Sequence, residues 1–375
     1  MLTNDQMNIL LLLRKSFGLS EESHKTEDAG ELAEMIMRNS ILLTVYPSLS
    51  EEDRETLKPE YNALLKQSIL QEYEGELVLN TLNDIGIESI ALKGWELRKL
   101  YPKSHMRQMA DVDILVRPYD YKRIKEAMEK KGFRFENEAF WKHDSIRKDS
   151  VHIELHKRLM DDSDEIRRWE HEMWNRAIRV RGNIFRMSPE DYCLFHFIHL
   201  HKDFMNGSLG LRRIVDTWLL QKQPVDEEWV KANLAKFGMQ TFYERMNHLS
   251  RTVMGEEPMD ENSEILLAHA FNYGIYGSDE SHKAGRIALM GKNLKNGKFQ
   301  SALSAVFLPI GQMKAFFPVL EKCPVLLPWC WLKRIVRIII RDRKQIWAKL
   351  NYNDINEDDY REAKRFFEAG GITRK

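Results

Sequence analysis

The sequence predicts an α+β protein with a mixed β-sheet core, flanked by N-terminal helices and followed by a large C-terminal helical region. Two observations support this fold class. Short apolar strands alternate with amphipathic helices between about residues 85 and 180. On both sides of this segment the apolar spacing is helical. We therefore expect a helical segment over residues 1–76, a sheet-containing core over 77–180 and a helical domain over 181–375.

The helices outside the core follow from apolar spacing and capping residues. The spacing predicts N-terminal helices over 8–17, 29–39 and 60–82. After the core, Ser188 is a typical N-cap, Pro189 suits the first helical position, and Asp191 adds a first-turn acid. The chain from Ser188 onward is therefore expected to be helical.

The core begins with a strand that runs into a glycine. Residues 87–92 form a short apolar strand, Lys93-Gly94 follows, and residues 95–101 have helical spacing. A strand that passes through glycine into a helix start can bind phosphate, because the backbone approaches closely and the helix offers free N–H groups. Arg107, further along, could hold a phosphate with two hydrogen bonds, or form a salt bridge with one of the aspartates that follow it.

Asp111 and Asp113 stand at the start of the apolar run Ile114–Val116, which predicts a buried strand. Residues two apart in a strand face the same side, so both carboxylates project together. Carboxylates this close repel each other, and a divalent cation that prefers oxygen ligands, Mg²⁺ or Mn²⁺, relieves the repulsion. For an isolated Asp-x-Asp, the alternative is an edge strand with two solvated side chains.

A third acid follows on a later strand. Residues 119–131 have the spacing of an amphipathic helix that stops at Gly132. The segment 151–156 then alternates, which places His152, Glu154 and His156 on one face. On a strand next to the Asp pair, an acid such as Glu154 would complete a three-carboxylate site, a geometry that fits two-metal phosphoryl chemistry.

In this order, the features resemble the DNA polymerase beta-like nucleotidyltransferase superfamily, and more closely its bacterial group of uncharacterised nucleotidyltransferases. In the core, the resemblance rests on Leu92-Lys93-Gly94, Tyr101-Pro102, Arg107, Asp111-x-Asp113, Gly132-Phe133 and Glu154-Leu155-His156. It continues through Ser188-Pro189-Glu190-Asp191, the helix with His196, His199 and His201, the segment Leu211–Asp216, and Leu327-Pro328 before a basic helix. It covers most of the chain.

The resemblance implies a nucleotidyltransferase-type core and an enzyme that uses Mg²⁺ or Mn²⁺ and a nucleoside triphosphate such as ATP. It gives the metal-binding and catalytic roles to Asp111, Asp113 and Glu154. It gives the triphosphate contacts to Lys93, Gly94 and Arg107. In the superfamily the glycine is typically followed by Gly or Ser, whereas Trp95 follows here, so the hydroxyl contact with the triphosphate is missing.

The composition bears on the binding partners and the cellular compartment of the protein. Lys+Arg and Asp+Glu both number 57 among 375 residues, so no overall charge attracts nucleic acid or anionic lipid. The three cysteines, Cys193, Cys323 and Cys330, lack metal-site spacing and are expected to be buried free thiols. We find neither a signal-peptide pattern nor an apolar stretch of membrane-spanning length, and expect a cytoplasmic protein.

Three further features allow more than one interpretation. On the helix with His196, His199 and His201, only the first two have metal-ligand spacing, and we favour histidines that are buried with hydrogen-bond partners or that line a cleft. Arg212 and Asp216 are spaced for a surface ion pair, with an arginine contact to phosphate or acceptor as the alternative. Residues 331–350 predict a basic amphipathic helix that packs its apolar face on its own domain, with lipid or nucleic-acid binding as the alternative.

The expected function is metal-dependent transfer of a nucleoside monophosphate to an acceptor hydroxyl, with release of pyrophosphate. The acceptor is expected to be a small molecule, a tRNA or a protein. Two alternatives stay open. A metal-dependent glycosyltransferase also uses Asp-x-Asp, although it does not explain Lys93-Gly94. A non-catalytic nucleotide-binding or partner-binding module is compatible with Trp95.

Overall fold

The computed structural model describes residues 2–22, 26–137, 143–159, 164–291, 293–317, 319–340 and 354–372. By contact, the chain forms two compact units. Unit 1 comprises Met1–Lys202 and Leu209–Tyr276, and unit 2 comprises Asp203–Ser208 and Gly277–Lys375. This division differs from the three segments expected from the sequence. The helix α4 (Glu51–Asp84) crosses the boundary expected at residue 76.

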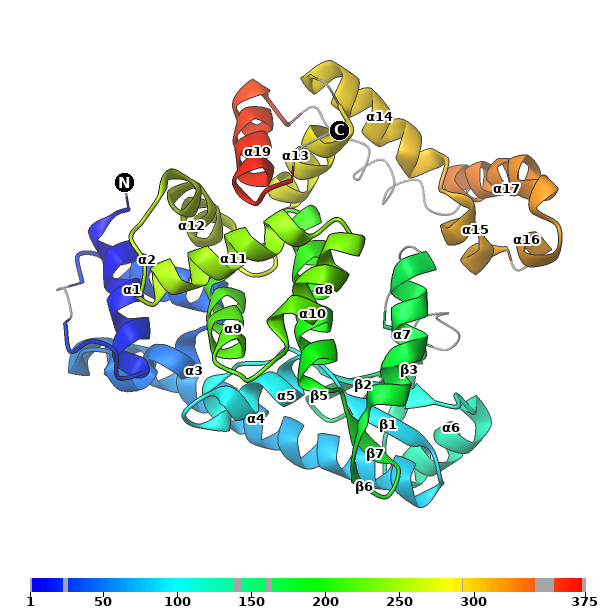
Figure 1. Ribbon diagram of the computed structural model, residues 1–375, viewed down its shortest axis with the longest axis horizontal. Coiled ribbons are helices and arrows are strands. Elements are labelled where there is room, and N and C mark those ends of the chain that lie inside the picture. The colour runs from blue at the N-terminus through cyan, green and yellow to red at the C-terminus, as the bar shows by residue number, and fades with distance from the viewer. Residues whose placement is uncertain are drawn as a thin grey trace. The chain divides into compact units, whose positions relative to one another are not determined.

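Unit 1 holds the β-sheet and most of the helices (Figure 1). Its other helices are α1 (Asn4–Ser16), α2 (Ala29–Arg38), α3 (Leu42–Val45), α5 (Gly94–Leu97), α6 (Tyr121–Lys130), α7 (Asp164–Arg176), α8 (Pro189–Met205), α9 (Leu211–Gln221), α10 (Glu227–Lys236), α11 (Gln240–Val253) and α12 (Glu261–Tyr273). Its strands are β1 (Glu88–Ala91), β2 (Val112–Arg117), β3 (Arg134–Asn137), β4 (His143–Lys148), β5 (Val151–His156), β6 (Ile178–Arg181) and β7 (Ile184–Arg186). The α+β fold class is confirmed.

The sheet is mixed and has the strand order β3-β4-β5-β2-β1-β7-β6. Its centre contains both kinds of pairing, since β2 is antiparallel to β1 and parallel to β5. The β2–β5 register sets Asp113 directly beside Glu154. The hairpin β6–β7 ends at Arg186, beyond the end of the α/β segment expected near residue 180.

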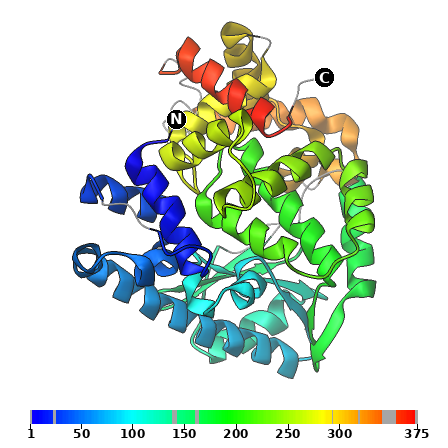
Figure 2. The ribbon, with the colours of Figure 1, turned by 60° about the vertical axis from the view of Figure 1, so that its left-hand side comes forward.

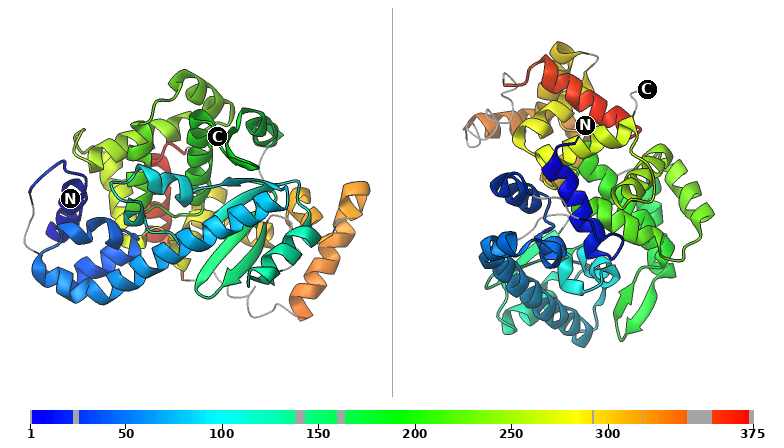
Figure 3. Two further views of the ribbon diagram at one scale, coloured as in Figure 1. Left: turned by 90° about the horizontal axis from the view of Figure 1, so that it is seen from below. Right: turned by 90° about the vertical axis from the view of Figure 1, so that its left-hand side faces the viewer.

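The two faces of the sheet have different chemistry. Alternate residues of β2 and β5, among them Ile114 and Ile153, join a buried core with Val78 of α4 and Ile124 of α6. Figure 3 shows α4 running along the sheet with α6 beside it. Because strand residues alternate in direction, Asp113, Glu154 and His156 face away from this core. The polar face predicted for residues 151–156 is therefore confirmed.

Within unit 1, the helices from α8 to α11 gather on the other side of the strands from α4, and Figure 2 shows them in green. The first of them, α8, begins as the sequence predicts. The Ser188 hydroxyl accepts a hydrogen bond from the Asp191 N–H at 3.1 Å, which is an N-cap bond. Helix α9 then packs against α11.

Unit 2 is helical, with α13 (Asp279–Met290), α14 (Leu294–Val306), α15 (Ile310–Phe316), α16 (Val319–Lys322), α17 (Leu327–Ile340) and α19 (Glu357–Ala369). Helix α13 packs against α14 and α19. Cys330 and Trp331 of α17 join an apolar cluster with Met313 and Leu320. Leu332 of the same helix is 51% exposed, so the predicted packing of the apolar positions holds only in part. Residues 341–350 of the expected basic helix lie outside the described residues.

All three cysteines are free. Cys193 and Cys330 are buried as expected, whereas Cys323, the residue before the short 3-10 helix Pro324–Leu326, is exposed. No helix in the described parts of the chain is long and apolar enough to cross a membrane.

Candidate nucleotide and metal site

Three carboxylates meet on the polar face of the sheet. Asp113 and Glu154 are paired residues of β2 and β5, and Asp111 directly precedes β2. Oxygens of Asp111 and Glu154 and a ring nitrogen of His152 all lie within 4.8 Å of one another. The structure thus brings together the three acids that the sequence singled out. Converging carboxylate oxygens are the ligands that Mg²⁺ and Mn²⁺ prefer.

Asp113 lies at the centre of this site and is buried. Its Oδ1 accepts a hydrogen bond from the Lys93 ammonium group at 2.5 Å. The same oxygen lies 2.7 Å from His156 Nε2. That ring nitrogen is also 3.2 Å from Glu154 Oε2, so the imidazole links two of the acids. The side chain of Lys93 therefore points into the site.

The charges shift the titration of the acids in opposite directions. Burial and the neighbouring Asp113 raise the pKa of Asp111 to about 6. Burial alone would also raise the pKa of Asp113, but Lys93 and His156 hold it well below its usual range. Asp111 therefore carries negative charge that its surroundings do not neutralise. A divalent cation would stabilise that charge, so the residues fit a metal site.

The turn at Lys93 has a strained backbone conformation. Lys93 has φ +43° and ψ −119°, an unusual region for a residue with a side chain. The Tyr192 hydroxyl of α8 donates a hydrogen bond to the Lys93 carbonyl and ties this turn to the helix. At Gly94, a Cβ would lie only 2.3 Å from Nη1 of Arg107, so a larger residue would displace the guanidinium that Asp216 holds. The turn is thus held by α8 on one side and by Arg107 on the other.

Trp95, which directly follows Gly94, does not face the carboxylates. Its ring is buried in the core beneath the sheet. There it packs against Gly75 of α4, where a Cβ would lie 2.4 Å from Trp95 Cζ3. The tryptophan anchors the start of α5 on α4.

Arg107 occupies a position different from the phosphate-facing one expected from the sequence. It is buried and holds Asp216 of α9 through two hydrogen bonds, from Nε to Oδ1 at 2.8 Å and from Nη2 to Oδ2 at 2.7 Å. The Tyr101 hydroxyl donates to the same carboxylate at 2.9 Å. This pairing directs the guanidinium towards α9, and Arg107 supports Gly94 from behind.

The prediction of a surface ion pair between Arg212 and Asp216 is also wrong. Both side chains are buried, and the Asp216 carboxylate is held by Arg107 and Tyr101. Arg212 instead donates a hydrogen bond to the carbonyl of Gln108. Helix α9 is therefore fastened to the segment that leads into the acidic strand.

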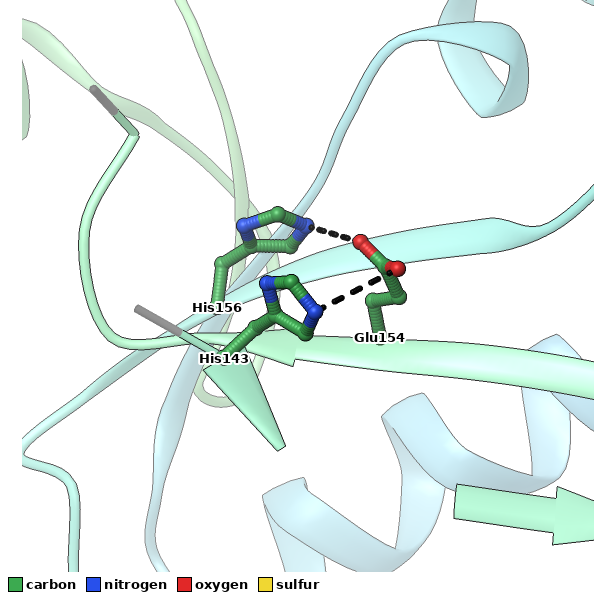
Figure 4. A group of neighbouring side chains, drawn as sticks. All are labelled: His143, Glu154 and His156. Carbon is green, nitrogen blue, oxygen red and sulfur yellow. Dashed lines mark ion pairs between the residues drawn. The ribbon is translucent and has the colours of Figure 1, made fainter. Parts of the chain in front are cut away.

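A residue that the sequence did not single out joins the site. His143, at the start of β4, is the cross-strand partner of His156. Its Nε2 lies 3.4 Å from Glu154 Oε1, and Figure 4 shows the carboxylate reached by both imidazoles. The segment 143–148 contains one strongly apolar residue, Ile146, so it carries no alternation that would have revealed the strand.

The histidines of α8 take a structural role. Within the described residues, the groups of His, Asp and Glu that converge closely enough for a metal lie on the sheet and next to it, and none includes His196, His199 or His201. His196 is buried, with Nε2 2.9 Å from the Thr217 hydroxyl. This agrees with burial beside a hydrogen-bond partner, the interpretation that the sequence favours.

His196 should make the protein sensitive to acid. Burial lowers the pKa of His196 to about 4, whereas an unfolded histidine titrates near 6.5. The unfolded chain therefore binds a proton first as pH falls. We expect the free energy of unfolding to fall by up to about 3 kcal/mol between pH 6.5 and 4 from this group alone. In urea titrations across this range, His196→Asn should flatten the dependence and the exposed control His171→Asn should not; equal slopes in all three proteins would contradict this role.

Comparison with known proteins identifies a family. A family model described as "Uncharacterised nucleotidyltransferase" matches residues 25–255, which include the whole sheet and the helices α2 to α11. No curated protein and no solved structure shows significant similarity to the chain.

Proposed function

Because the chain belongs to the uncharacterised nucleotidyltransferase family, we propose that it moves a nucleoside monophosphate from a nucleoside triphosphate to an acceptor hydroxyl. The acceptor oxygen forms a bond to the α-phosphorus, the bond from that phosphorus to the β-phosphate oxygen breaks, and pyrophosphate leaves. The proposed acceptor is a small molecule, a tRNA or a protein, and the proposed setting is the cytoplasm.

The observation that carries this proposal is that oxygens of Asp111 and Glu154 lie within 4.8 Å of each other, while Asp113 is paired with Glu154 in the β2–β5 register. Asp111 and Asp113 would hold Mg²⁺ or Mn²⁺, and Glu154 would be a third ligand or the base for the acceptor hydroxyl. A divalent cation bound there would neutralise charge on the triphosphate and on the leaving pyrophosphate.

The residues around the acids have proposed roles of their own. Lys93 reaches the site from the turn before α5 and would hold a phosphate oxygen by charge. Gly94 lets the backbone approach closely. If Glu154 acts as the base, it takes the proton of the acceptor hydroxyl, and His156 at 3.2 Å orients its carboxylate. Arg107 has no direct role and positions Gly94.

One observation favours a second candidate, a nucleotide-binding module without catalysis. The Lys93 ammonium group lies on Asp113 Oδ1, where it neutralises the acid as a cation would. If Lys93 keeps that position when nucleotide binds, a cation is held less firmly. The nucleotidyltransferase would convert the bound triphosphate, whereas the non-catalytic module would bind it without reaction.

Turnover can be tested with the pure protein. We expect incubation with each α-labelled nucleoside triphosphate, Mg²⁺ or Mn²⁺ and cell extract to label an acceptor and release one pyrophosphate per label. Chelation of the metal should stop both. Binding of triphosphate with no label in any fraction would support the non-catalytic module, and hydrolysis of sugar nucleotides would support the glycosyltransferase.

Lys93→Met should have opposite effects on the two ligands. Removal of the ammonium group takes away a charged contact with the triphosphate, and we expect about tenfold weaker triphosphate binding. It also frees Asp113, so Mn²⁺ should bind more tightly. Calorimetry with each ligand measures both effects. The control is Lys99→Met, an exposed lysine paired with Glu96, which should change neither; unchanged triphosphate affinity in Lys93→Met would make Lys93 structural.

A further inference from the structure

Three side chains beside the carboxylate site form a cluster of mixed donors. His143 and His156 face each other across β4 and β5, with ring centroids 5.2 Å apart. Glu154 lies two residues before His156 on the same face of β5. One donor atom from each of these three residues lies within 4.8 Å of the others. The cluster stands on adjacent strands of one sheet, so the backbone fixes its spacing.

The separations match those of ligands around one cation. Two ligands about 2.0–2.2 Å from a metal, at angles between octahedral and tetrahedral, are about 3–3.5 Å apart. Glu154 Oε1 is 3.4 Å from His143 Nε2, and Glu154 Oε2 is 3.2 Å from His156 Nε2. In Figure 4 each imidazole directs a ring nitrogen at a different oxygen of the same carboxylate. A cation held there would replace the proton that His156 Nε2 shares with the carboxylates of Asp113 and Glu154.

The donor types restrict the metal. Mg²⁺ is bound by oxygen ligands and keeps several waters, whereas imidazole nitrogen suits first-row transition ions, the later ones such as Zn²⁺ most and Mn²⁺ least. Glu154 also lies in the other group, with Asp111 and His152. A shared carboxylate between two cation positions is the arrangement of two-metal sites.

We propose that His143, Glu154 and His156 form a second cation position that takes a first-row transition ion in preference to Mg²⁺. It rests on the proposed function insofar as the neighbouring carboxylates bind the first cation. The two positions would share Glu154. The enzyme would then need a transition ion, and not Mg²⁺ alone, to fill both.

Pulsed electron paramagnetic resonance of bound Mn²⁺ tests this directly, without turnover. Metal-free protein receives Mn²⁺ at two equivalents, and electron spin-echo modulation detects nitrogen that binds the ion. We expect modulation from imidazole ¹⁴N in the natural protein. Labelling with ¹⁵N-histidine, which leaves the fold unchanged, should replace that pattern. Absence of nitrogen modulation from protein-bound Mn²⁺ would overturn the proposal.

Variants then locate the nitrogen. His143→Asn should remove some of the modulation and lower the affinity for the second Mn²⁺ about tenfold or more, while affinity for Mg²⁺ changes less than threefold. His171→Asn, an exposed histidine of α7, is the control and should change neither the modulation nor the affinity. His152→Asn tests the other group, in which His152 lies with Asp111 and Glu154. Modulation that disappears in His152→Asn and persists in His143→Asn would contradict the assignment.

The outcome is separable from that of the proposed function. A protein that shows imidazole-bound Mn²⁺ but transfers no nucleotide would retain this cation position and lose the enzymatic role. If the protein transfers nucleotide with Mg²⁺ alone and shows no nitrogen modulation, the enzymatic role stands and the cation position at His143, Glu154 and His156 is ruled out.

Discussion

Replacing Asp113 by asparagine should lower nucleotidyl transfer by about 10³-fold, and Asp111→Asn should do the same. An amide cannot replace a charged metal ligand, and several kcal/mol of charge stabilisation in the transition state correspond to about this factor. Rates of pyrophosphate release at saturating triphosphate and metal measure the loss. The matched control is Glu136→Gln, an acid on β3 paired with Arg147, which should keep its rate. Full activity in both asparagine variants would remove the assignment.

The same two variants should differ in stability without metal. From the sequence, either change would relieve repulsion between the two acids. The structure separates them. The raised pKa of Asp111 means that its charge is unfavourable in the folded protein, so apo Asp111→Asn should melt at or above the wild-type temperature. Asp113 neutralises the Lys93 ammonium group, so Asp113→Asn should lower the free energy of unfolding by about 1–3 kcal/mol. Equal melting temperatures in chelator would contradict this charge arrangement.

Asp216→Ala should lower the free energy of unfolding by about 3–5 kcal/mol, because it leaves the buried Arg107 guanidinium without its carboxylate. The Arg107 and Asp216 side chains are 8% and 2% exposed, so water cannot replace the lost partner. Denaturant titration measures the effect. Loss of support behind Gly94 should also weaken triphosphate binding.

Two further variants identify the cause. The double variant Arg107→Met with Asp216→Leu removes both charges and should recover much of the lost stability. Lys58→Met, which breaks an exposed pair with Glu55, should cost less than about 1 kcal/mol. If Asp216→Ala were as stable as Lys58→Met, the pair would not be buried in the protein.

The elements that sequence analysis placed correctly are those with strong local periodicity. Residues 151–156 alternate strictly, and β5 occupies the same span. The start of α8 follows from the cap at Ser188. The long helix α4 begins at Glu51, earlier than the start predicted at residue 60, because Ser50 provides the N-cap and the helix continues through Pro59. Local signals thus determined the type of an element better than its ends.

Sequence analysis selected the three acids that meet in the structure, but it placed only some of the other residues around them correctly. The three acids meet because β2 and β5 are neighbours, an order that came from the family resemblance. Arg107 was misplaced because its partner, Asp216, lies 109 residues away, and no local pattern links them. Lys93 has a positive φ angle, a backbone conformation that local sequence patterns do not reveal for a residue with a side chain. Local sequence patterns do not reveal ion pairs between residues far apart in the chain, or strained backbone angles at single residues.

In the proposed reaction the protein transfers the nucleoside monophosphate part of the triphosphate, which contains the α-phosphate, to the acceptor. The most direct measurement compares α-labelled with γ-labelled triphosphate in parallel incubations with the same acceptor fraction and metal. We predict label in the acceptor from the α position, label in pyrophosphate from the γ position, and neither with Asp113→Asn. Acceptor labelled from the γ position, or triphosphate bound but recovered intact from every fraction, would contradict nucleotidyl transfer.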